Sequence, residues 1–184
     1  MNFPSPEMSK LIKPPLVQLF ISFIYSESSE LKTCIKKLKN NFGPLSLKSK
    51  IFKFNHSEYY KKEMGDNLNR KVIGFQNLIE RDKLVEIKIF TNSLEEQFSF
   101  EERRTINLDP GYISGEHLIL ATGKGFYHRP YLGKGVYADL TLVYQQNSLR
   151  ALEWTYPDYK SENMLGVFHK LRNIYTEKLK EGNY

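Results

Sequence analysis

Residues 16–25 are the feature that most constrains how this chain can fold. The run reads Leu-Val-Gln-Leu-Phe-Ile-Ser-Phe-Ile-Tyr and is apolar except for Gln18 and Ser22. A membrane-spanning helix needs about 20 apolar residues, so this run is too short to cross a bilayer. Its length is typical of a central β-strand buried on both faces, and we expect a sheet built around it.

The composition is that of a globular protein. A length of 184 residues suits one domain, and 40% hydrophobic with 26% charged residues excludes a wholly disordered chain. The single cysteine, Cys34, excludes an intrachain disulfide and a multi-cysteine zinc site, and fits a reducing compartment. No secretory cleavage pattern follows the apolar run. We therefore expect a soluble, cytoplasmic protein without a membrane segment.

Apolar periodicity predicts three helices. The first is capped by Ser28 or Ser29 and ends at Gly43-Pro44, with Cys34 in its apolar stripe as a structural thiol. The second begins near Asp82 as its N-cap, and the third begins at Ser161.

Further strands are predicted around these helices. The segments with strand character are 46–54, 71–79, 104–109, 117–122 and 136–144, with a polar aromatic connection at 55–70. Pro110-Gly111 is predicted to turn the chain. Alternation puts Val136, Ala138, Leu140 and Leu142 on one face of the last of these strands.

The order of these elements predicts an α+β fold. Its first six elements follow the βαββαβ order of a ferredoxin-like sandwich, whose antiparallel or mixed sheet is covered on one face by two helices. A β extension and a closing helix follow. We expect one domain over residues 1–184, with 1–15 as an extended lead-in.

The positive charge is concentrated in the N-terminal part of the chain. Residues 1–75 carry 13 basic and 6 acidic side chains, whereas the remainder is nearly balanced. A basic face can bind nucleic acid by counterion release. A solvated helix face bearing Lys32, Lys36, Lys37 and Lys39 explains the same charges, so nucleic acid ranks as the third candidate partner.

The C-terminal half carries a distinctive set of motifs. They are Asn107-Leu-Asp-Pro-Gly-Tyr112, Ala121-Thr-Gly-Lys124, His128-Arg-Pro-Tyr-Leu-Gly133, Gly135-Val-Tyr-Ala-Asp139 and Trp154-Thr-Tyr-Pro-Asp-Tyr159. With these motifs the chain resembles, over essentially its whole length, the uncharacterised prokaryotic family catalogued as domain of unknown function 4416. The resemblance implies a one-domain protein without an established activity.

Common catalytic and nucleotide-binding motifs are missing from the sequence. It has no G-x-x-x-x-G-K-[ST], G-x-S-x-G, H-E-x-x-H, C-x-x-C or Rossmann fingerprint. A phosphate-binding loop of the P-loop type is therefore excluded.

The glycine-rich segment 123–135 is a candidate anion site. It contains Lys124, His128 and Arg129 among four glycines, which let backbone amides approach an anion, while arginine offers a bidentate fork. An ordinary hairpin with solvated charges is the alternative. His128 could act as an acid or base, bind a metal, or be a hydrogen-bonded structural residue.

Asp109 and Asp139 are the candidate carboxylates. On paired strands they could hold a divalent cation such as magnesium or share acid and base duty, so Asp109, His128 and Asp139 are the candidate catalytic residues. The alternatives are a turn-stabilising Asp109 and an exposed Asp139. Structural zinc is not expected, because His56, His117, His128 and His169 offer no pair at ligand spacing.

Aromatic residues complete the predicted site. Tyr112, Tyr137 and Trp154 are candidates for a ligand-binding wall, and Glu63 is a further candidate contact. The Trp154 cluster can stack a base or sugar, or instead pin the last helix to the sheet. We expect the C-terminal motif residues to form one concave polar site.

The combined pattern favours recognition of a small phosphorylated molecule or nucleotide, with an enzymatic role left open. Lys124, His128 and Arg129 would then hold the anion. The alternative is a non-catalytic binding or assembly module, followed by RNA binding through the basic N-terminal half. The sequence leaves the oligomeric state undetermined.

Overall fold

Nine strands form the main sheet in the computed structural model, which describes residues 10–27, 30–55, 58–100 and 103–182. The strands are β1 (Val17–Tyr25), β2 (Leu45–Lys48), β3 (Phe52–Lys53), β4 (Asn69–Ile79), β7 (Ile106–Ile113), β8 (His117–Thr122), β9 (Tyr131–Gly133), β10 (Val136–Gln145) and β11 (Ser148–Ala151). Their order is β11-β10-β8-β7-β1-β4-β2, with β3 on β4 and β9 on β10, and every pairing is antiparallel.

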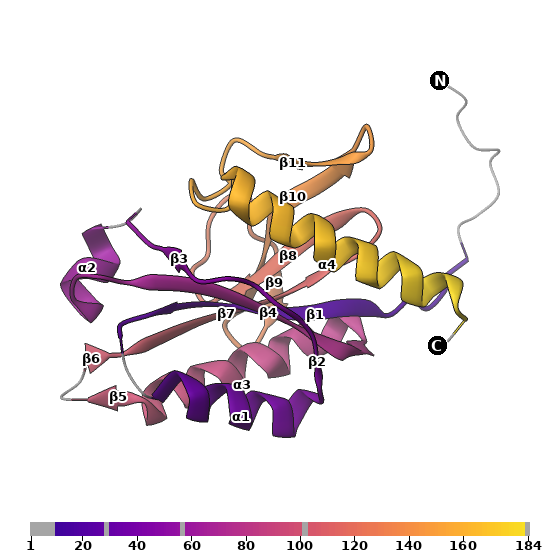
Figure 1. Cartoon of the computed structure of the whole chain (residues 1–184). Coiled ribbons are helices and arrows are strands. Elements are labelled where there is room, and N and C mark those ends of the chain that lie inside the picture. The colour runs from indigo at the N-terminus through magenta and orange to yellow at the C-terminus, as the bar shows by residue number, and fades with distance from the viewer. Residues whose placement is uncertain (1–9, 28–29, 56–57, 101–102, 183–184) are drawn as a thin grey trace.

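Helices lie on both faces of this sheet (Figure 1). They are α1 (Glu30–Phe42), α2 (Glu58–Met64), α3 (Leu84–Gln97) and α4 (Glu162–Lys180), and a 3-10 turn, Arg81–Lys83, leads into α3. A separate hairpin pairs β5 (Ser99–Phe100) with β6 (Arg103–Arg104). Of the helices in the described ranges, none is long and apolar enough to cross a membrane.

The predicted α+β class is confirmed. The elements β1, α1, β2, β4, α3 and β7 occur in this order along the chain, with the shorter elements β3, α2, β5 and β6 between some of them, and their strands lie in the order β7-β1-β4-β2. This is the arrangement of a ferredoxin-like sandwich. The predicted β extension is β8 to β11, which widens the sheet beyond β7, and α4 is the predicted closing helix.

Two hydrophobic layers hold the helices to the sheet. On one face Ile21 and Phe23 of β1 pack in a cluster with Cys34 of α1 and Ile87 of α3. On the other face Phe20 packs in a cluster with residues of α4, whose buried stripe is Met164, Phe168, Leu171 and Tyr175. All nine residues of β1 are buried, as predicted for a strand covered on both sides.

Some element boundaries differ from the prediction. The expected strand at 46–54 is divided into β2 and β3, which both pair with β4. The connection at 55–70 contains a short helix, α2, and the start of β4. A helix of seven residues is too short to show a periodic apolar pattern, so the sequence did not predict α2.

The helix caps give a mixed result. Ser161 caps α4 as predicted, accepting a hydrogen bond from the Met164 amide at 3.4 Å. Asp82 is not an N-cap, because it lies within the 3-10 turn and Lys83 occupies the cap position of α3 without a side-chain hydrogen bond. The predicted caps Ser28 and Ser29 lie outside the described residues.

The predicted turn at Pro110-Gly111 is wrong, because β7 continues through both residues. Pro110 lies opposite Ile21 of β1, and Gly111 lies opposite Phe20. A Cβ atom at Gly111 would come within 2.4 Å of the Ile119 carbonyl oxygen. The glycine therefore permits a close approach of β7 and β8, and the chain reverses only after Ile113.

The predicted alternation along β10 holds only in part. Val136 shares a cluster with Tyr112, with Ala138 and Leu140 packed against it, whereas Leu142 belongs to the cluster on the α4 face. The register of β10 against β8 shifts between Leu140 and Leu142. This bulge moves Leu142 to the opposite face.

The two halves of the sheet separate between β7 and β8. Pairing of these strands is confined to Gly111, Tyr112 and Ile113 on β7. The part of β7 before Pro110 therefore has no β8 partner, although β8 remains paired with β10 as far as Thr122. The resulting opening in the sheet lies above α3 and contains the candidate site.

Cys34 is expected to be inert in the folded protein. The thiol is fully buried, and burial raises its pKa to about 12. Because the thiolate is the reactive form, a thiol reagent should label the native protein only after unfolding. Labelling with Ellman's reagent in buffer and in 6 M guanidinium tests this, and rapid stoichiometric labelling in buffer would contradict it.

Candidate functional site

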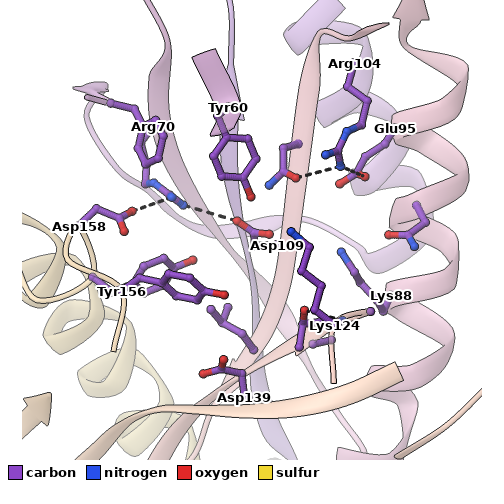
Figure 2. Close-up of a pocket in the computed structure, with 18 of the residues that line it drawn as sticks. Tyr60, Arg70, Lys88, Glu95, Arg104, Asp109, Lys124, Asp139, Tyr156 and Asp158 are labelled. Atoms are coloured by element: carbon purple, nitrogen blue, oxygen red, sulfur yellow. Dashed lines mark hydrogen bonds and ion pairs between the residues drawn. The ribbon is translucent and has the colours of Figure 1, made fainter. Parts of the chain in front are cut away.

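A pocket of about 470 Å³ occupies the opening between β7 and β8. Side chains from α2, β4, α3, β7, β8, β10 and the segment before α4 line it. Figure 2 shows Tyr60, Asp109, Lys124 and Tyr156 arranged around its centre. Volumes of this order are typical of small-molecule sites.

Side chains of α3 replace the missing strand beside β7. Lys88 donates to the Leu108 carbonyl at 3.1 Å, and the Leu108 amide donates to Glu95 Oε1 at 2.5 Å. Both backbone groups would otherwise be buried without partners, at a cost of roughly 1–3 kcal/mol each. The opening is thus a stable part of the fold, and it brings α3 side chains into the pocket.

Arg70 forms the wall on the β4 side. Its side chain is 5% exposed, and its guanidinium lies 2.6 Å from Asp158 Oδ2 and 3.7 Å from Asp109 Oδ2. It also donates to Ser22 Oγ at 2.6 Å and faces the ring of Tyr159 at 5.1 Å. Burial alone would lower the pKa of Arg70, but Tyr159, Asp158 and Asp109 keep it above its ordinary value.

Arg104 closes the opposite wall. It donates to both carboxylate oxygens of Glu63 at 2.6 and 2.7 Å, to Glu95 at 3.0 Å and to Asn107 Oδ1 at 3.2 Å. These bonds lower the pKa of Glu63, whereas burial raises the pKa of Glu95 against the effects of Lys88, the Leu108 amide and Arg104. The bidentate contact with Glu63 ties α2 to the hairpin β5–β6.

Two lysines face the pocket without an ion pair among the described residues. Lys88 is bonded only to the Leu108 carbonyl, and the Lys124 ammonium lies 4.5 Å from the centre of the Tyr59 ring. Nearby, the Asn107 amide nitrogen is buried and has no hydrogen-bond partner in the described part of the chain. These three groups can donate hydrogen bonds to a ligand.

Asp139 lies at the floor of the pocket, and hydrogen bonds from Arg129 and Thr141 hold its carboxylate. Arg129 Nε donates to Asp139 Oδ2 at 2.7 Å, and Thr141 donates to Oδ1 at 3.0 Å. His128 Nε2 is 3.6 Å from Oδ2, and the His128 ring stacks on Trp154 with centroids 4.8 Å apart. The alternative of an exposed Asp139 is wrong, since the residue is 2% exposed.

Tyrosines supply the less polar walls. Tyr60 and Tyr156 both line the pocket, and burial raises the pKa of each. Tyr156 is partly exposed at 41%, and its hydroxyl accepts from Arg129 at 2.7 Å. Both phenols therefore stay protonated near neutral pH and can donate hydrogen bonds.

The predicted site residues fall into three groups. Asp109, Lys124 and Asp139 line the pocket together. Glu63, His128, Arg129 and Trp154 lie behind its walls, where they contact Arg104, Asp139, Tyr156 or the Leu140 carbonyl. Two predicted wall residues do not line it: Tyr112 packs with Ile119 on the opposite face of the sheet, and Tyr137 packs against Tyr131 at 5.1 Å.

The aromatic cluster before α4 is divided between the pocket and the core. Tyr156 lines the pocket, while Tyr159 is fully buried and stacks on Phe168 of α4 with centroids 5.4 Å apart. The alternative that this cluster pins the last helix to the sheet therefore describes Tyr159.

The sequence did not reveal the arginines and α3 residues of the pocket. Arg70 and Arg104 occupy strands and Lys88 and Glu95 a helix, at positions that are ordinary for solvent-exposed charges. A weak signal existed in α3, since Lys88 and Glu95 are seven positions apart and share the buried stripe with Thr91 and Leu94.

The carboxylates do not converge on a metal. Strand β8 lies between β7 and β10, so Asp109 and Asp139 are not on paired strands as the magnesium hypothesis assumed. No group of three His, Cys, Asp or Glu side chains suited to a metal ion occurs in residues 10–27, 30–55, 58–100 and 103–182, and His56 is outside them.

Comparison with known proteins identifies a family. A family model described as "Domain of unknown function (DUF4416)" matches residues 15–175, nearly the whole chain. Neither the curated proteins nor the solved structures give a significant match.

Replacing Arg70 with methionine should strongly destabilise the protein. The change leaves Asp158 and Asp109 without their shared cation, and removing one partner of a buried ion pair costs about 3–5 kcal/mol. Urea denaturation measures the loss, with the exposed Arg150→Met as a matched control expected within about 0.5 kcal/mol of wild type. A loss for Arg70→Met as small as that of the control would refute a structural role.

The contact between Glu63 and Arg104 should make stability depend on pH. Because the pKa of folded Glu63 lies below its ordinary value of 4.5, its contribution is present above that pH and is lost as the pH falls through the folded pKa. Glu63→Gln should therefore cost up to about 1 kcal/mol at pH 7 and progressively less towards pH 3.5. Urea denaturation at both pH values measures this loss of stability, with the exposed Glu153→Gln as the control. The same loss of unfolding free energy at pH 7 and at pH 3.5 would contradict the prediction.

Proposed function

The chain belongs to the DUF4416 family, whose description assigns no activity, and we propose from its pocket that the protein binds a small phosphorylated molecule or nucleotide. The observation that carries this proposal is the division of charges in the pocket. Each of its carboxylates, Glu95, Asp109, Asp139 and Asp158, is paired with an arginine. Lys88 and Lys124 are left without a carboxylate among the described residues and can meet an anionic group.

Further donors accompany the two ammonium groups. The buried Asn107 amide nitrogen is unpartnered in the described chain, and Tyr60 has a protonated hydroxyl in the same pocket. A phosphate offers several acceptor oxygens, and its hydrogen bonds to charged donors in a partly dry site are worth about 1.5–3 kcal/mol each.

The balance of charge disfavours a bare anion as the ligand. Three arginines and two lysines lie in or behind the pocket with five carboxylates, counting Glu63, so the site as a whole has no excess positive charge. Asp109 has only the 3.7 Å contact with Arg70 and can accept a hydrogen bond from a ligand hydroxyl. A phosphorylated molecule with hydroxyl groups fits this combination better than inorganic phosphate does.

The walls support a ligand with a ring. Tyr60 and Tyr156 offer aromatic surfaces, and the volume of about 470 Å³ leaves room beside a phosphate for a sugar or base. A pocket with enclosed polar groups also favours ligand binding over the flat apolar surface expected of an assembly module.

The test is a thermal-shift screen of nucleoside monophosphates, sugar phosphates and inorganic phosphate, followed by titration calorimetry. A ligand that binds the native state raises the melting temperature with concentration. Lys124→Met should weaken binding roughly tenfold or more, because it removes a charge-assisted contact. Lys88→Met should act likewise.

Charge and folding need separate controls. Lys36→Met, on the exposed face of α1, removes the same charge elsewhere and should leave binding unchanged. Melting temperatures of the ligand-free variants show whether Lys88→Met, which also unpairs the Leu108 carbonyl, still folds. Failure of every phosphorylated compound to stabilise the wild type, or equal binding by Lys124→Met, would overturn the proposal.

A further inference from the structure

The segment from Gly123 to Gly135, here called the aromatic loop, exposes several large rings beside the pocket. Phe126, Tyr127 and Tyr131 are 60%, 76% and 61% exposed. Solvent-exposed aromatic rings are costly to hydrate, and their concentration in one short loop indicates a contact surface.

The loop is also cationic throughout. It carries Lys124 and Lys134, both exposed, together with Arg129, whose guanidinium is paired with Asp139, and it contains no acidic residue. Protein-binding patches usually carry aromatic residues within a polar rim and are depleted in lysine. Exposed rings flanked by unpaired lysines, with no carboxylate in the loop, are the pattern of surfaces that stack bases and neutralise phosphates.

Hydrogen bonds hold the loop in a defined shape. The Arg129 amide donates to the Phe126 carbonyl at 3.0 Å, and the Arg129 guanidinium donates to the Lys124 carbonyl at 3.1 Å. The Tyr131 hydroxyl accepts from the Gly135 amide at 3.2 Å. The exposed rings are thus carried on a fixed backbone, which lowers the entropy lost when a partner stacks on them.

The loop is continuous with the pocket. Gly123 and Lys124 line the pocket, and Arg129 binds both Asp139 and Tyr156 in its walls. Phe126 follows Lys124 by two residues, which span at most about 7 Å. A phosphate held by Lys124 and a ring stacked on Phe126 can therefore belong to neighbouring units of one strand.

We propose that the protein binds the phosphorylated end of a single-stranded nucleic acid, with the terminal phosphate in the pocket and the adjoining bases on Phe126 and Tyr127. This rests on the proposed function, because it takes the pocket as a phosphate site. The pocket can hold a terminal group, while the exposed loop accepts bases of any sequence through their ring faces.

Fluorescence anisotropy with ten-nucleotide oligo(dT) and oligo(U) tests the proposal. The oligonucleotides are compared with a 5′-phosphate, with a 3′-phosphate and with neither, the dye being placed at the opposite end. We expect tighter binding of one phosphorylated form, and affinity that falls as salt is raised. Phe126→Ala and Tyr127→Ala should each weaken binding by roughly fivefold or more, as loss of a stacked base does.

Two variants separate the contributions. Lys124→Met should abolish the preference for the phosphorylated end and leave the weaker stacking contribution. Ile89→Ala removes an exposed apolar side chain from α3 and should change nothing. Because Phe126 and Tyr127 are exposed, their alanine variants should keep the melting temperature of the wild type, which is measured in parallel.

The outcomes distinguish this inference from the proposed function. If no oligonucleotide binds while a small phosphorylated compound still stabilises the wild type, the inference is wrong and the pocket assignment stands. Equal binding of phosphorylated and unphosphorylated strands would also overturn it. So would alanine variants that alter self-association in sedimentation but not oligonucleotide binding, since the loop would then be a protein interface.

Discussion

The buried guanidinium of Arg70 is the interaction on which the architecture of the pocket depends. Desolvating a charge costs several kcal/mol, and only close compensation makes its burial tolerable. Asp158, Asp109 and Ser22 provide that compensation from the segment before α4, from β7 and from β1, and the rings of Phe54 and Tyr159 cover it. One side chain of β4 thus contacts β1, β7 and the segment that leads into α4, and links their positions.

The separation of β7 from β8 is the second constraint. Antiparallel strands normally continue pairing until one of them ends, but here the pairing stops at Gly111 although both strands continue. The unpaired backbone of Leu108 is satisfied by Lys88 and Glu95 of α3. A helix that covers one face of the sheet therefore reaches through it, so that the pocket receives groups from both layers.

The elements fixed by long-range periodicity could be predicted, whereas those decided by tertiary context could not. The run at 16–25 and the stripe of α4 each extend over several turns or pleats, so their burial followed from the sequence. Pro110-Gly111 has the local signature of a turn, yet pairing with β1 along the whole of β7 overrides it. Likewise α2 is too short for periodicity, and contacts such as Glu63 with Arg104 hold it in place.

The same distinction explains which parts of the site were foreseen. Asp109, Lys124 and Asp139 stand in dense motifs and proved to share one pocket, but nothing local marks Arg70 as buried or Arg104 as part of a pocket wall. Arginine and lysine have different tasks there. The planar guanidinium offers several donors in a fixed fork and binds two carboxylates at once, as Arg104 does with Glu63 and Glu95. Lysine offers a compact charge on a flexible stem, and only the two lysines lack a carboxylate in the described pocket. The arginines therefore build the walls, and the lysines are the cations left without a carboxylate that can contact a ligand.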